Sequence, residues 1–153
     1  MKIINNDRSG IVRGLFDTGA QRSSIRKAIA YKLGLKPVDQ EMLSHGLLGG
    51  SGTKQESRNV YNITLQSLCS NFKHNISILD EKKMCGAIPR VQNPDMYPIL
   101  KRKNIYLIET GEDVPEIGLL IGADYIGTLL TGTVESVDNH LVAIRTKLGW
   151  TLQ

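Results

Sequence analysis

The residues best suited to chemistry are Asp17, Thr18 and Gly19, which directly follow the apolar pair Leu15 and Phe16. Two apolar residues before an acid mark a strand that leaves the core, and a glycine lets the backbone turn tightly beyond it. Carboxylates suit hydrolysis of a peptide bond, because an ionised one takes a proton from water while a protonated one polarises the carbonyl group. The pattern therefore predicts a reactive carboxylate at Asp17.

This chemistry needs two carboxylates, and the chain contains one Asp-Thr-Gly triplet. Two carboxylates within hydrogen-bonding distance repel each other, so the pair shares one proton; the aspartic protease dyad is the established example. A homodimer supplies both acids when each protomer contributes Asp17 across a two-fold axis. The single triplet thus predicts a site that a second copy of the chain completes.

Two further stretches of the sequence could belong to the same site. Leu120, Ile121 and Gly122 suit a short strand, and residues 124–130 suit a helix after it; an ordinary buried strand with a glycine exit is the alternative. A glycine-rich segment lies between the two motifs, at Gly46, Leu47, Leu48, Gly49, Gly50, Ser51 and Gly52. Such a composition suits a mobile β-hairpin that closes over a bound peptide, with a plain flexible turn as the alternative.

A phosphate-binding loop is not supported by this glycine-rich segment. Such a loop needs Gly-Lys-Ser/Thr at the start of a helix. Here Lys54 comes after Thr53, and no amphipathic helix follows.

The Asp-Thr-Gly-Ala run at 17–20 resembles the active-site motif of the retropepsins, the retrovirus-type aspartic proteases. Within that family the chain resembles the proteases of Pao/BEL-type LTR retrotransposons, over residues 17–35, 119–130 and 146–150. The segment from 58 to 116 matches only loosely. The resemblance implies an all-β retropepsin-like fold with short helices, formed by residues 1–153 as a single domain, with the active site at a homodimer interface.

The resemblance also assigns roles to particular residues. Asp17 of each subunit would form the dyad, and Thr18 and Gly19 would hold it, with the Thr18 hydroxyl bonding across the two-fold axis. Gly46 to Gly52 would form the flap, and the strand ending at Gly122 would lie beside the catalytic loop. The implied substrate-binding residues are Ala20, Leu47, Leu48, Gly49, Gly50, Leu120 and Ile121.

The implied activity is that of an aspartic endopeptidase that cleaves junctions in a retrotransposon Gag-Pol-type polyprotein. Water is the nucleophile, so no metal or organic cofactor is expected. The alternative is an inactive or domesticated relative kept for dimerisation or peptide binding, but the triplet Asp17, Thr18 and Gly19 is complete. A serine or cysteine hydrolase has little support, because no such nucleophile has a recognisable histidine context.

Composition and charge agree with one globular domain. The 153 residues are 41% hydrophobic and 22% charged. The formal net charge of +4 comes from scattered Lys and Arg residues with one tight cluster at residues 101–103, so direct nucleic-acid binding is not expected. The expected partners are a second copy of the chain and a polypeptide substrate.

The cysteines and histidines show no metal-ligand spacing. Cys69 and Cys85 form no CxxC motif and imply no disulfide framework, and His45, His74 and His140 are isolated. No run approaches the ~20 apolar residues of a membrane helix, and no signal peptide is recognised after Met1. These features predict a cytoplasmic protein, free or inside virus-like particles, without a membrane partner.

The apolar periodicity predicts the remaining elements. Residues 1–6 and 11–16 suit a hairpin with its turn at 7–10, and residues 23–33 suit a helix capped by Ser23 or Ser24 and ended by Gly34. Residues 61–65 and 72–78 alternate as strands, prolines interrupt 87–104, and 141–144 and 148–152 suit C-terminal strands, which the resemblance places at the subunit interface.

One charge pair is also expected. Many viral relatives have acidic residues after the catalytic motif and an arginine after the later glycine. This chain has Arg22 in the first place and Asp124 in the second, so the two are expected to pair in exchanged roles.

Overall fold

The computed structural model describes residues 1–43, 55–90, 94–108 and 113–153, and strands predominate over helices in them, as expected for an all-β chain. None of their helices has the length and apolar character needed to cross a bilayer. The helices are α1 (Lys27–Lys32), α2 (Met96–Arg102) and α3 (Ala123–Leu129). The strands are β1 (Lys2–Asn5), β2 (Arg8–Ile11), β3 (Gly14–Phe16), β4 (Ser24–Arg26), β5 (Asp39–Leu43), β6 (Glu56–Gln66), β7 (Lys73–Glu81), β8 (Leu119–Ile121), β9 (Leu130–Ser136), β10 (Val142–Thr146) and β11 (Gly149–Leu152).

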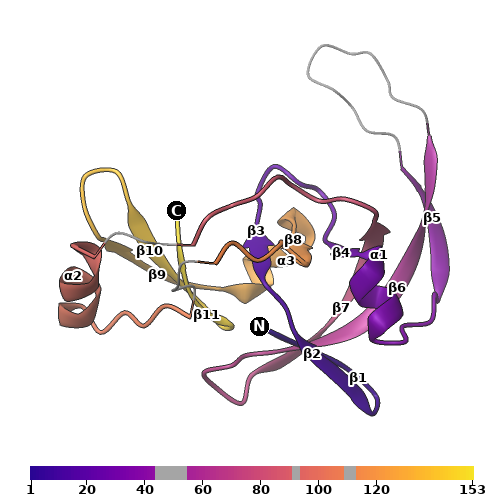
Figure 1. Cartoon of the computed structure of the whole chain (residues 1–153), viewed down its shortest axis with the longest axis horizontal. Coiled ribbons are helices and arrows are strands. Elements are labelled where there is room, and N and C mark those ends of the chain that lie inside the picture. Colours follow the sequence, from indigo (N-terminus) through magenta and orange to yellow (C-terminus); the bar gives the residue numbers. More distant parts are fainter. Residues whose placement is uncertain (44–54, 91–93, 109–112) are drawn as a thin grey trace.

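The larger sheet carries the elements next to Asp17. Its strand order is β2-β1-β6-β7-β4-β8-β3, and β5 also pairs with β6. Figure 1 shows β3, β8 and α3 near the middle, β5 and α1 on one side, and α2 with the C-terminal strands on the other. The turn that contains Asp17 therefore lies between the two ends of the molecule.

The main core consists of aliphatic side chains that alternate along the strands. The strands predicted at 61–65 and 72–78 are confirmed, since β6 and β7 pair antiparallel with Ile63 opposite Ile76. Both side chains are buried, and Ile25 and Leu119 from the short strands β4 and β8 are fully buried beside them. Burying a side chain of this size contributes about 1.5–3 kcal/mol, so these strands form a firm base for the turn.

The N-terminal hairpin is confirmed, but its turn lies earlier than predicted. Asn6 and Asp7 form the turn between β1 and β2, in place of residues 7–10. Asn6 has a φ of 48°, in the left-handed region that asparagine tolerates better than most residues. The predicted second strand is also divided, because β2 ends at Ile11 and the separate strand β3 leads to Asp17.

The helix predicted over 23–33 begins later in the structure. Ser24–Arg26 form β4, which pairs with β7 on one side and β8 on the other. No side chain caps α1, so the predicted cap by Ser23 or Ser24 is wrong, because both serines are buried in the sheet region instead. The predicted end is confirmed, since Gly34 has a φ of 63° and closes α1 as a left-handed C-terminal residue.

The C-terminal strands form a second sheet with a core of its own. Its order is β11-β10-β9, which confirms the C-terminal strands predicted at 141–144 and 148–152 and adds β9. The interruption predicted over 87–104 is only partly right, because α2 forms inside it. Pro98 lies in the first turn of α2, where a missing N–H breaks no intrahelical bond. Met96 and Leu100 of α2 are buried in this second core.

Candidate active site

The Asp17 turn begins where β3 ends beside β8. The two strands are parallel, with Phe16 opposite Ile121, and the Asp17 amide donates to the Ile121 carbonyl oxygen at 3.0 Å. The predicted neighbourhood of the two motifs is thus present. Because β3 and β8 leave the sheet at the same end, the half-buried Asp17 is held at the edge of the core.

The Asp17 carboxylate is oriented by its own turn. The Gly19 amide donates to Asp17 Oδ1 at 2.9 Å, and the Ala20 amide donates to the Asp17 carbonyl oxygen at 3.3 Å. Such a side-chain to backbone bond gives the acid one preferred orientation. Thr18 and Gly19 are exposed at the tip of the turn, and Ala20 is half-buried. The tip is therefore accessible to another molecule.

The other end of the turn is fastened to the start of α3. The Gly122 amide donates to Ser23 Oγ at 2.9 Å, and Ser23 Oγ donates to Asp124 Oδ1 at 2.6 Å. The Ser23 amide donates to Asp124 Oδ2 at 2.9 Å, and the Ala123 amide donates to the Ala20 carbonyl oxygen at 2.8 Å. Ser23 is fully buried. These hydrogen bonds hold the segment after Asp17 against Gly122 and the start of α3.

The expected pair of Arg22 and Asp124 is confirmed. Arg22 Nη1 lies 3.4 Å from Asp124 Oδ2. Arg22 Nη2 also lies 2.8 Å from Oε2 of Glu41 on β5, a contact that the sequence analysis did not anticipate. Ser23 was likewise missed as a bridging residue, because its partners lie about a hundred positions away in the chain and no local pattern marks them.

The remaining predicted site residues lie in different settings. Leu120 is half-buried on β8, and Ile121 is fully buried, so its side chain supports the turn from within the core. The predicted flap at 46–52, with Leu47, Leu48, Gly49 and Gly50, lies outside the described residues. Neither cysteine forms a disulfide, and no three His, Cys, Asp or Glu side chains gather as metal ligands within the described part of the chain.

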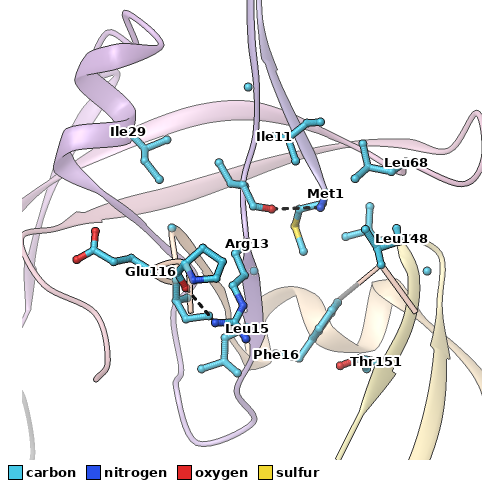
Figure 2. Close-up of a pocket in the computed structure, with 18 of the residues that line it drawn as sticks. Met1, Ile11, Arg13, Leu15, Phe16, Ile29, Leu68, Glu116, Leu148 and Thr151 are labelled. Carbon is cyan, nitrogen blue, oxygen red and sulfur yellow. Dashed lines mark hydrogen bonds between the residues drawn. The ribbon is translucent and has the colours of Figure 1, made fainter. Parts of the chain in front are cut away.

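A large hollow opens beside β3 rather than at the acid itself. Its volume is about 1010 Å³, and it is lined by Leu15 and Phe16 but not by Asp17. Figure 2 shows Arg13 inside this hollow, between Met1 and Phe16. The Arg13 guanidinium donates to the main-chain carbonyl groups of Ile88, Pro89 and Pro115. Arg13, directly before β3, thus holds two connecting segments against the strand that leads to Asp17.

A second carboxylate, Asp80 on β7, is fully buried but belongs to a structural cluster. Its oxygens accept hydrogen bonds from the Asn59 amide at 3.1 Å, Asn59 Nδ2 at 2.9 Å and the Tyr61 hydroxyl at 3.3 Å. Lys27 Nζ lies 3.6 Å from Asp80 Oδ2. With these partners around it, Asp80 satisfies the condition for a stable buried charge.

Burial, followed by the nearby Asp80 charge, raises the pKa of Tyr61 above its ordinary value of 10.0. A raised pKa means that the folded state favours the protonated phenol. The stabilisation is therefore complete below pH 10 and is lost as the pH rises through the folded value. We expect Tyr61→Phe to lose about 1 kcal/mol at pH 7, and this deficit to shrink above pH 10. Urea unfolding of both proteins from pH 7 to 11 measures it; a deficit that grew above pH 10 would contradict it.

No protein-family model, curated protein or solved structure matches this chain. The function is therefore inferred from the site itself and from the motif resemblance described above.

Proposed function

We propose that this chain is a retropepsin-like aspartic endopeptidase that acts as a homodimer on a polyprotein of a Pao/BEL-type LTR retrotransposon. The observation that carries the proposal is the Asp17 carboxylate just after β3, which accepts a hydrogen bond from the Gly19 amide, while the Asp17 backbone amide donates to the Ile121 carbonyl oxygen. Thr18 and Gly19 are exposed at the tip of the turn, where a second molecule can reach them.

The proposed reaction uses two copies of Asp17 that share one proton. The ionised carboxylate takes a proton from water, and the protonated one donates a hydrogen bond to the scissile carbonyl oxygen. The water oxygen attacks the carbonyl carbon while the protonated carboxyl transfers its proton to the carbonyl oxygen, which gives a tetrahedral gem-diol. As the C–N bond breaks, the carboxyl that took the proton from water gives it to the leaving amine nitrogen, and the other carboxylate takes a proton back from a gem-diol hydroxyl. The proton count returns to its starting value, so the chain needs no metal or organic cofactor for these steps.

The test combines cleavage of a mixed peptide library with a measurement of molecular size. We expect cleavage next to apolar residues, and a specific activity that rises with protein concentration until dimers predominate in sedimentation. Dimers that cleave no peptide would favour the alternative of an inactive dimerisation module. A monomer at every concentration would refute the proposed site.

Ala20 predicts a shift in the pH dependence of this activity. A serine hydroxyl at this position would donate a hydrogen bond to the ionised dyad and favour it over the protonated one. We therefore expect Ala20→Ser to move the activity optimum to lower pH, relative to the natural chain. Matched pH profiles of kcat/KM check this, and coincident or oppositely shifted profiles would contradict it.

A further inference from the structure

The strand β5 meets the Asp17 turn through one ion pair. Glu41 lies in the middle of β5, and the strand pairs along one side with β6. From the turn, Arg22 Nη2 reaches Glu41 Oε2 at 2.8 Å. The turn and β5 are 19 residues apart in the chain, so this contact is made by the fold and not by local sequence. It gives β5 a link to the turn that its strand pairing does not provide.

Arg22 is held on a second side as well. Its Nη1 lies 3.4 Å from Asp124 Oδ2, and Asp124 is fixed by two hydrogen bonds from Ser23. The Asp124 side chain is 16% exposed, whereas Arg22 and Glu41 are 33% and 37% exposed. The more buried carboxylate of Asp124 thus anchors the guanidinium. The more exposed carboxylate of Glu41 can be removed by substitution without disturbing the core.

We propose that Arg22 and Glu41 are positioning residues that set the place of β5 against the Asp17 turn. This rests on the proposed function, because its consequence for catalysis requires a peptide bound at the turn. Glu41 bonds to Arg22, whereas the Asp17 carboxylate is oriented by the Gly19 amide. Loss of the pair therefore frees β5 beside the turn without removing the hydrogen bond that orients the Asp17 carboxylate. Such a change raises KM and leaves kcat nearly constant.

The test uses Glu41→Gln, Arg22→Gln and the double variant, with Glu135→Gln as the matched control. Glu135 pairs with Lys103 at 3.1 Å, and its side chain is 41% exposed, but this pair lies between α2 and β9, away from the turn. Exposed ion pairs contribute little, so we expect amide exchange in β5 to quicken about 1.5- to 5-fold in Glu41→Gln. The control should leave β5 exchange unchanged.

Two results support the proposal together. KM should rise by a similar factor in Glu41→Gln, and the double variant should add little to Arg22→Gln, because that change already removes the partner of Glu41. Unchanged β5 exchange in Glu41→Gln, or a fall in kcat with constant KM, would overturn it. Amide exchange can be measured whether or not the chain is active. A chain that cleaves no peptide would therefore refute the proposed function, while the exchange rates in β5 would still test the role of the ion pair.

Discussion

Asp17→Asn is expected to abolish peptide cleavage while leaving the fold and the association of the chain intact. Asparagine has nearly the same shape, and its carbonyl oxygen can still accept the hydrogen bond from the Gly19 amide. The amide cannot take a proton from water, and in the proposed homodimer the substitution removes both acids at once. Loss of general acid–base catalysis costs about 10²- to 10⁴-fold in kcat, measured by initial rates on a cleaved peptide.

A mixing experiment makes this prediction specific for a shared site. Excess Asp17→Asn chain added to the natural chain should form heterodimers with one acid each, so the activity should fall with the fraction of variant. Sedimentation and urea unfolding should show that the variant folds and associates normally. Activity that survives the substitution, or that ignores the added variant, would remove the dyad assignment.

Gly122→Ala is expected to damage both stability and activity. A Cβ at Gly122 would lie 2.7 Å from the Ala20 carbonyl oxygen and 2.9 Å from the Arg22 carbonyl carbon, and both are backbone atoms of the segment that follows Asp17. The backbone of Gly122 has a φ of −91°, which any residue adopts, so the penalty comes from space alone. Overpacking of this kind costs about 1–3 kcal/mol of unfolding free energy.

The loss of activity in Gly122→Ala follows from the same contacts. The added methyl group pushes the turn away from the start of α3, where the Ala123 amide donates to the Ala20 carbonyl oxygen. A misplacement of about 1 Å at an active site can cost about 100-fold, so we expect a loss of this order in kcat/KM. Gly127→Ala in α3 is the matched control, since its Cβ would meet nothing within 4 Å and should stabilise the helix by about 0.5–1 kcal/mol. Equal urea midpoints for Gly122→Ala and the natural chain would contradict the prediction.

The elements that were predicted correctly are those whose residues repeat along the chain. The alternation at 61–65 and 72–78 predicts β6 and β7 because one face of each must be buried against the core. The helix α3 follows Gly122 as expected, starting one residue earlier than predicted. The predicted start of α1 is too early because Ile25 shares the helical spacing of Ala28, Ile29 and Leu33, yet Ser24–Arg26 form a strand between β7 and β8.

The candidate site was predictable where it depends on one short motif. Asp17 and Gly19 lie two residues apart, so their mutual hydrogen bond is a local property of the turn. The ion pair of Arg22 and Asp124 could be predicted only from the resemblance to the retropepsins, because the two residues lie 102 positions apart in the chain. Glu41 could not be identified as the other partner of Arg22, since many acidic residues were equally available in the sequence.

By itself the sequence determined which acid follows a short strand in a glycine turn and which residues alternate into the core, because both depend on neighbours only a few positions away. The tertiary structure decided which distant residues meet: Ser23 with Asp124, Arg22 with Glu41, and Gly122 against the Ala20 carbonyl group. The physical reason is the distance along the chain over which each interaction acts. Backbone geometry and apolar periodicity act locally, whereas hydrogen bonds and ion pairs between remote residues require the packed strands β3, β4 and β8 to bring them together.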